Sequence, residues 1–176
     1  MTIRIVGLVA AVALLAAPVA AEDAPATYGA AMSWYQRGVA SGDANAQYLA
    51  GVRTESGVAG APDLAQALKL YALSAASGHL QAAYRLGRLR LEQGDAEGAR
   101  QALRSVAEQG HVGAQSLLGY LLGAAARRPD DIREADYWLE RAARAGDATA
   151  AENLARLAPL LGPEDRAAVA ARLSQP

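Results

Sequence analysis

The sequence contains no cysteine and no phenylalanine, and aromatic residues make up only 5% of its 176 residues. Without cysteine the chain cannot form a disulfide framework, a thiolate metal site or a cysteine nucleophile. An oxidising compartment is not excluded, because a core of this size can be stable without disulfides. The 52% hydrophobic content is mostly alanine and leucine, which favours closely packed helices over a β-sandwich.

No charge of one sign dominates the sequence. It has 17 basic and 18 acidic residues, and its formal net charge is −1. The basic patch that marks a nucleic-acid-binding protein is therefore missing, and we expect no nucleic-acid partner. No block of like charges indicates a disordered tail.

The first 21 residues differ in character from the rest of the chain. Arg4 supplies a short positive start, residues 5–17 form an uninterrupted apolar run, and Pro18 precedes small residues that end at Ala21. This layout is typical of a secretory signal peptide. We expect cleavage near Ala21 and a periplasmic or secreted protein. The alternative is a retained membrane anchor, although the apolar run is at the short limit for a span.

Four glycines share one repeating frame in the remaining sequence. Gly42, Gly78, Gly110 and Gly146 are spaced 36, 32 and 36 residues apart. Alanine recurs eleven residues before and four residues after each of them, at Ala31, Ala67, Ala99, Ala135, Ala46, Ala82, Ala114 and Ala150. Self-similarity at a period of 20–50 residues predicts a repeat architecture, which presents a surface more readily than a catalytic pocket.

Aspartates mark the helix starts that this frame predicts. Asp43 and Asp147 directly follow a frame glycine, while Asp63, Asp95 and Asp131 each stand four residues before a frame alanine. Because an aspartate side chain accepts hydrogen bonds from the free amides of a first turn, we expect all five to cap helices. Apolar residues then recur at helical spacing, and this pattern predicts two helices in each unit.

Three glycines are predicted to lie inside helices at one register position, at Gly51, Gly87 and Gly119. A helical glycine costs about 1 kcal/mol relative to alanine. Its recurrence implies a packing reason, namely a neighbouring helix that passes too close for a side chain.

The repeated motifs resemble those of the Sel-one-like repeat (SLR) family, a relative of the tetratricopeptide repeat. Trp34-Tyr35 and Tyr137-Trp138 occupy the family's aromatic slot, and the second unit matches in order at Ala82, Leu86-Gly87, Asp95, Ala99 and Gly110. The resemblance covers about residues 30–157. It implies an all-α fold, an α-solenoid of stacked antiparallel helix pairs wound as a right-handed superhelix.

The frame also predicts how the chain is divided. The expected parts are a signal peptide at 1–21, a short linker at 22–28, an SLR solenoid at 29–161 with full repeats 43–78, 79–110 and 111–146 between flanking helices, and a capping helix and tail at 162–176.

The two histidines, His79 and His111, occupy the same frame position. They could form a metal or acid–base pair. We favour a role in starting helices, because Asp43 and Asp147 hold that position elsewhere and residues one repeat apart are too distant for shared ligation. No nucleophile elbow, phosphate loop or dinucleotide fingerprint is present. We therefore expect no enzymatic activity, no catalytic, metal or cofactor-binding residues, and no cofactor.

A protein-binding groove is the remaining candidate site. If the geometry is similar to that of tetratricopeptide repeats, the first helix of each unit lines the concave face. Its outward positions carry Tyr and Arg, which dominate interface energetics, together with Asn and Gln. The alternatives are that Tyr48 and Tyr84 serve packing, and that tips, loops or another face bind the partner. The candidate groove residues are Asn45, Tyr48, Gln81, Tyr84, Arg88, Tyr120 and Arg156.

The sequence and the resemblance together predict an exported, non-catalytic scaffold, adaptor or modulator of the bacterial cell envelope. Its expected partner is another protein, such as an envelope or signalling receptor protein, and we expect a monomer. Membrane contact is expected only if the N-terminal segment is retained. Two alternatives stay open: a cell-wall or small-molecule hydrolase, and a membrane-anchored accessory subunit of an envelope complex.

Overall fold

The structure is a computed structural model that describes residues 28–58 and 60–175. The signal peptide expected at 1–21 lies outside the described residues, as does nearly all of the linker. The chain divides into two units, residues 1–34 and 35–176, and the second holds every helix after the first.

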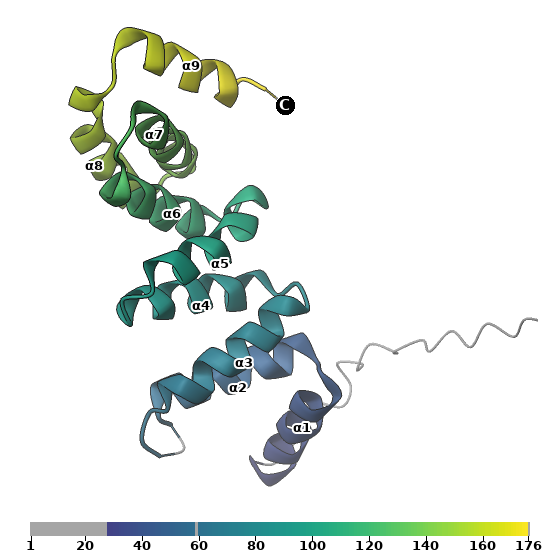
Figure 1. Cartoon of the computed structure of the whole chain (residues 1–176). Helices are drawn as coiled ribbons and strands as arrows, with labels where there is room; N and C mark the ends of the chain where they lie inside the picture. The colour runs from purple at the N-terminus through teal and green to yellow at the C-terminus, as the bar shows by residue number, and fades with distance from the viewer. Residues whose placement is uncertain (1–27, 59, 176) are drawn as a thin grey trace, which may run out of the picture. The chain divides into compact units, whose positions relative to one another are not determined.

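Every regular element in the described part of the chain is a helix (Figure 1). The helices are α1 Tyr28–Ser41, α2 Ala44–Ser56, α3 Leu64–Ala76, α4 Leu80–Glu92, α5 Ala96–Glu108, α6 Val112–Ala125, α7 Pro129–Arg144, α8 Ala148–Leu157, the 3₁₀-helix η2 Ala158–Leu160 and α9 Pro163–Leu173.

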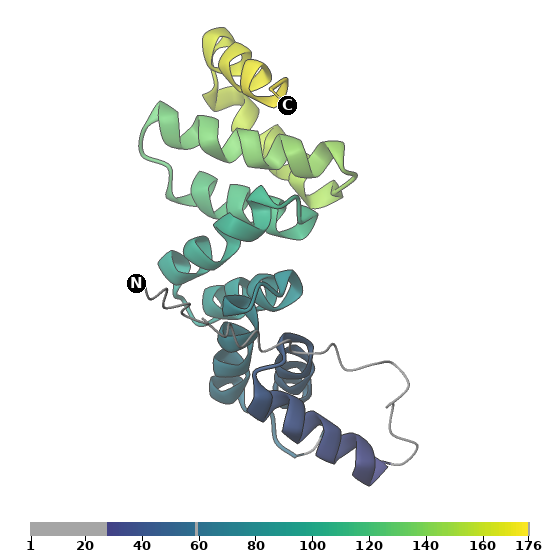
Figure 2. The same ribbon diagram turned by 90° about the vertical axis from the view of Figure 1, so that its right-hand side faces the viewer.

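Helices that follow one another in the sequence pack side by side from α2 to α8, and α9 packs on α7 (Figures 1 and 2). The first helices of neighbouring repeats also touch, because α4 contacts α6 and α6 contacts α8. This is the all-α repeat solenoid that the sequence predicts. The first helices consequently share one surface on which the candidate groove can form.

The frame alanines form the contacts between these helices. Apart from Ala31, whose side chain lies outside the described set, all of them are completely buried: Ala46, Ala67, Ala82, Ala99, Ala114, Ala135 and Ala150. Larger side chains fill the space around them, such as Tyr71 on α3, Leu103 on α5 and Leu139 on α7. The small residues therefore repeat because neighbouring helix axes approach closely at these points.

The three helical glycines have the packing reason that the sequence predicts. A Cβ added at any of them would lie 2.6 Å from a side-chain carbon of the second helix in the same repeat: Gly51 against Tyr71, Gly87 against Leu103, and Gly119 against Leu139. Real Cβ atoms do not approach carbon so closely. Glycine is therefore required at these positions so that a large side chain of the second helix can pack directly against the first helix.

Four of the five aspartates cap helices as expected. The side chains of Asp43, Asp63, Asp95 and Asp147 each accept a hydrogen bond from the backbone amide three residues later, over 2.7–2.9 Å. Each bond satisfies one of the amides that a helix start leaves free.

Asp131 was wrongly assigned as a cap. Helix α7 begins two residues earlier, at Pro129, and Asp131 lies in its first turn. There its carboxylate accepts from the backbone amides of Arg127 and Arg128, over 3.1 and 3.0 Å. Proline is favoured at the first helical position because its fixed φ suits the helix and its missing amide is not needed. Pro129 therefore moved the start of the helix.

Both histidines act as helix caps. Nδ1 of His79 accepts from the amide of Ala82, and Nδ1 of His111 accepts from the amide of Ala114, each over 3.1 Å. This is the same bond that Asp43 makes at the equivalent position. The interpretation of the histidines as helix starters is confirmed.

Removing the His79 cap is expected to destabilise the protein. His79→Ala should lower the free energy of unfolding by about 1 kcal/mol, because an amide of α4 loses its acceptor. His79→Asp should recover the part of the loss that the cap accounts for, since Asp43 caps α2 in the same way. Chemical denaturation of the two variants beside the parent protein measures this. Equal losses in both variants would contradict the capping role.

The C-terminal part differs from the expectation in one respect. A single helix is expected to run to about residue 161, but α8 ends at Leu157 and a 3₁₀ turn follows over Ala158–Leu160. Pro159 cannot donate the hydrogen bond that a continued α-helix requires, which explains the change. No helix of residues 28–58 and 60–175 combines the length and the apolar character needed to cross a membrane.

Candidate protein-binding groove

An open groove of about 430 Å³ runs across three neighbouring first helices, α4, α6 and α8. Its sides are formed by residues from the outward faces of these helices and by the cap of α8. The lining residues are Tyr84, Arg88, Gly113, Ser116, Leu117, Tyr120, Asp147, Thr149, Glu152, Asn153 and Arg156.

Four candidate residues of the sequence analysis meet in this groove: Tyr84, Arg88, Tyr120 and Arg156. The three other candidates, Asn45, Tyr48 and Gln81, do not line it. Asn45 and Gln81 are exposed on the first turns of α2 and α4, and Tyr48 is half-buried. The groove therefore occupies only the C-terminal three of the four first helices.

The two half-buried candidate tyrosines have a packing role that links neighbouring repeats. The residue six positions after a frame glycine contacts the capping residue of the next repeat. The contacts are Tyr48 stacked on His79 with ring centres 4.5 Å apart, Tyr84 stacked on His111 at 4.7 Å, and the Ser116 hydroxyl donating to Asp147 over 3.2 Å. Where the cap is histidine its neighbour is aromatic, and where it is aspartate its neighbour is a hydroxyl.

The freest side chains of the groove belong to α6 and α8. Tyr120 is 46% exposed although it is a large hydrophobic residue, and Arg156 is exposed as well. Arg156 makes no ion pair within the described ranges. Among the described residues neither side chain makes a hydrogen bond or ion pair that a ligand would have to break.

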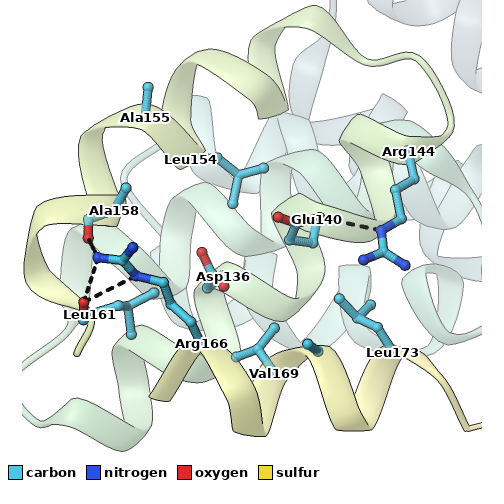
Figure 3. A pocket seen from close by; sticks show the side chains of 11 residues that line it. Asp136, Glu140, Arg144, Leu154, Ala155, Ala158, Leu161, Arg166, Val169 and Leu173 are labelled. Carbon is cyan, nitrogen blue, oxygen red and sulfur yellow. Dashed lines mark hydrogen bonds and ion pairs between the residues drawn. The ribbon is translucent and has the colours of Figure 1, made fainter. Parts of the chain in front are cut away.

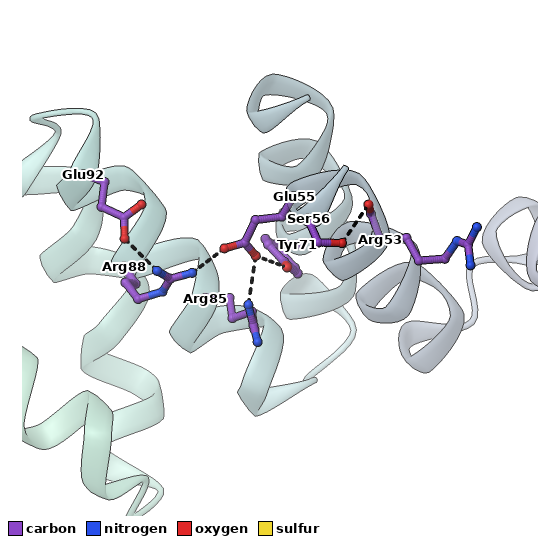
Figure 4. A network of polar contacts seen from close by, with 7 residues as sticks. All are labelled: Arg53, Glu55, Ser56, Tyr71, Arg85, Arg88 and Glu92. Carbon is purple, nitrogen blue, oxygen red and sulfur yellow. Dashed lines mark hydrogen bonds and ion pairs between the residues drawn. The ribbon is translucent and has the colours of Figure 1, made fainter. Parts of the chain in front are cut away.

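Arg88, in contrast, is held in place at one end of the groove (Figure 4). Its guanidinium pairs with Glu55 from α2 and with Glu92 one turn further along α4, the latter over 2.7 Å. Glu55 also accepts from Arg85 over 2.9 Å and from the hydroxyl of Tyr71. One carboxylate thus joins α2, α3 and α4.

The electrostatics of this cluster favour the charged form of Glu55. Burial alone would raise the pKa of Glu55, but the hydrogen bond from Tyr71 and the charges of Arg88 and Arg85 outweigh it, so that the pKa lies below its ordinary value. Burial and the bond to Glu55 raise the pKa of Tyr71, whose hydroxyl therefore remains protonated and donates.

An apolar recess of about 170 Å³ adjoins the groove between α6, α7 and α8. Tyr120, Asn153 and Arg156 line both. Gly123 forms part of its wall, with Leu139 and Leu157 beside it. The recess offers room for one aliphatic side chain next to the exposed ring of Tyr120.

The sequence analysis missed Leu117 and Asn153, which lie seven residues after a frame glycine. At 3.6 residues per turn this position lies on the same face as positions three, six and ten, so helical spacing could have identified it. Asp147 was assigned as a cap, and it is one. That it also borders the groove depends on how α6 and α8 are placed.

The arrangement offers binding groups of several kinds. The groove combines hydroxyl, amide, carboxylate and guanidinium groups with an apolar recess, a combination that suits a peptide segment. Across residues 28–58 and 60–175 there is no group of three or more acidic or histidine side chains placed to hold a metal ion.

Two solved structures are similar to this chain. One is c5321, a protective antigen present in uropathogenic Escherichia coli strains and displaying an SLR fold; the match has a TM-score of 0.65 and 28% identity over 73% of this chain. The other is a Sel1 repeat protein from Oxalobacter formigenes, with a TM-score of 0.61 and 28% identity over 72% of this chain. The matches cover 28% and 54% of those two proteins. No family model and no curated protein matches the sequence.

Proposed function

We propose, from the premise that this chain has the Sel1-like repeat fold, that it is a non-catalytic scaffold or adaptor which binds a segment of another protein. The groove over α4, α6 and α8, with the apolar recess beside Tyr120, is the observation that carries this proposal. The binding segment is a peptide that places one aliphatic side chain in the recess.

The energetic argument concerns three residues. An exposed Tyr and an exposed Arg beside a pocket are the residue types that contribute most to protein interfaces. Tyr120, Asn153 and Arg156 line both the recess and the groove. An aliphatic side chain that fills the recess would remove apolar surface from water, which stabilises the complex by about 25 cal/mol per Å². Arg156 is available to pair with a carboxylate or carbonyl of the partner.

The place of action is the cell envelope of a bacterium. The signal-peptide pattern that ends at Ala21 supports export. The composition suits an exported protein because no cysteine can be oxidised there. Intact mass of the protein recovered from the periplasm tests export: the loss of residues 1–21 is expected, and an uncleaved chain in the membrane fraction would contradict it.

Crosslinked pull-down from envelope extract, followed by mass spectrometry, tests partner binding. The test variant carries Tyr120→Ala and Arg156→Ala, two exposed residues of the groove. The control carries Asn45→Ala and Gln81→Ala, two exposed candidate residues that stand three places after a frame glycine and lie outside the groove. A partner should be recovered by the parent and the control, and at least tenfold less by the test variant.

The result can contradict the proposal at two levels. A partner that the test variant still retains fully would place the binding surface elsewhere on the solenoid. If no partner is recovered reproducibly by the parent protein, the scaffold function itself is contradicted. Equal melting temperatures of the two variants are required, so that a loss of binding reports the groove and not unfolding.

A further inference from the structure

A second cavity, of about 290 Å³, lies between α7, α8, η2 and α9 and shares no lining residue with the groove (Figure 3). Most of its wall is aliphatic, and a few charged residues enter it from α7 and α9. Its lining residues are Asp136, Glu140, Arg144, Leu154, Ala155, Ala158, Leu161, Arg166, Val169, Ala170 and Leu173.

Asp136 is the notable polar residue of this cavity. It is only 8% exposed, and its carboxylate lies among the aliphatic side chains of the wall, between Leu154 and Val169 (Figure 3). Within the described part of the chain it makes no hydrogen bond and no ion pair. Buried carboxylates in proteins are normally paired, so an unpaired one lining a cavity indicates a missing partner.

The charged neighbours of Asp136 are engaged elsewhere. The guanidinium of Arg166 donates to the backbone carbonyls of Ala158 and Leu161, the latter over 3.0 Å. On α7, Glu140 accepts from Arg144 over 3.3 Å. The lining residues of α8 and η2 carry no charge. Among residues 28–58 and 60–175, no cationic side chain is therefore paired with the Asp136 carboxylate.

Burial without a paired cation disfavours the charged form of Asp136. Burial raises the pKa of this carboxyl, and the nearby charge of Glu140 raises it further, while the charge of Arg166 opposes both. A cation that reaches Asp136 would remove this cost and would be attracted more strongly than in water, because the surroundings are apolar.

We propose that this cavity binds a primary alkylammonium group, whose charge pairs with Asp136 and whose aliphatic stem contacts Leu154, Val169 and Leu173. An ammonium is compact enough to meet a single carboxylate that lies among aliphatic side chains, and an alkyl stem suits the walls. A lysine side chain of a protein and a free alkylamine present the same chemistry.

Binding can be measured by nuclear magnetic resonance on the ¹⁵N-labelled protein. Two probes separate the sources: 1,5-diaminopentane as a free amine, and N-acetyl-lysine-N-methylamide as a lysine side chain in a peptide-like frame. The same lysine compound with its side-chain amine acetylated is the uncharged control. Chemical-shift changes are expected in α7, α8 and α9 with at least one charged probe, and none with the acetylated compound.

The matched variants are Asp136→Asn in the cavity and Glu152→Gln in the groove. Asp136→Asn keeps the side-chain shape and should weaken probe binding at least tenfold, whereas Glu152→Gln should leave it unchanged. The stronger of the two charged probes identifies the source. Absence of shifts in α7 to α9, equal shifts with the acetylated compound, or unchanged binding by Asp136→Asn would overturn the proposal.

Asp136→Asn also has a readout that does not depend on the ligand. Since the folded pKa of this acid is raised, its favourable contribution is present in acid and is lost as pH rises through that pKa. Near neutral pH the variant should therefore melt at the same temperature as the parent or a few degrees higher, and this gain should disappear in acid. The variant is thus expected to fold, which keeps the binding test decisive.

Discussion

Replacing Gly87 by leucine is expected to lower the free energy of unfolding by about 3 kcal/mol or more. Even a Cβ at this position would lie 2.6 Å from Cγ of Leu103, which is completely buried on α5. Leu103 cannot move aside without displacing its neighbours, so α4 and α5 must separate. Thermal unfolding measures the loss, and about 1 kcal/mol corresponds to ~2–4 °C in a domain of this size.

An alanine pair separates the steric cause from helix propensity. Gly87→Ala gains about 1 kcal/mol of helix propensity but meets the same contact, so a net loss is expected. Gly123→Ala gains the same propensity in α6, while its Cβ would lie 3.4 Å from the nearest atom of Leu157, an ordinary to slightly tight contact. We expect Gly123→Ala to be neutral or stabilising by up to about 1 kcal/mol.

Two outcomes would contradict this account of the repeat. If the melting temperature of Gly87→Leu equals that of the parent protein, α4 and α5 do not approach each other as closely as they do in the structure. If Gly87→Ala and Gly123→Ala change the melting temperature equally, the glycine is retained for some reason other than packing.

The second large effect is expected from Glu55→Ala, which should destabilise the protein by about 2–3 kcal/mol. The main cost is the hydroxyl of Tyr71, because this completely buried residue loses its acceptor. Arg85 and Arg88 contribute less, since their side chains are 34% and 36% exposed and water screens them. Urea unfolding at neutral pH measures the loss.

Glu92→Ala is the matched control for Glu55→Ala. Glu92 also pairs with Arg88, but its side chain is 51% exposed, so its removal should cost well under 1 kcal/mol. A similar loss in both variants would show that the ion pairs, and not the Tyr71 hydroxyl, account for the stability. Because Glu55 positions Arg88 in the groove, Glu55→Ala should also weaken partner binding.

The Glu55 cluster also predicts a dependence on pH. The pKa of Glu55 is lower in the folded protein than its ordinary value of 4.5. Its stabilisation is therefore fully present above that value and is lost as pH falls through the lower folded pKa. Glu55→Gln keeps an acceptor for Tyr71 but has no charge to titrate, so the difference between parent and Glu55→Gln should shrink in acid. A constant difference would contradict the charged role.

Features that depend on one helix or one repeat could be read from the sequence. Asp43 and His79 cap helices through a bond to the residue three places on, and helix geometry alone fixes that distance. Glycine recurs at the register position of Gly87 in three repeats, and this recurrence indicated its packing role. Asp131 was misassigned because Pro129, two residues earlier, was an equally good start for the helix.

The candidate groove could be predicted only in part. Helical spacing and the resemblance placed Tyr120 and Arg156 on the outward face of first helices, and the groove contains both. They could not show that the groove omits Tyr48, which lies on α2, the one first helix of residues 35–58 and 60–175 that the groove does not reach. Whether the groove binds a partner stays a prediction.

The sequence by itself determined the all-α repeat, the register of its units and most of the helix caps, because these follow from spacing along one chain segment. Only the tertiary structure decided that Glu55 joins three helices, that Gly123 borders an apolar recess and that Asp136 is buried without a partner among the described residues. These contacts join residues from different helices. They depend on how closely two backbones approach and which way each side chain turns, and neither is a periodic property of the sequence.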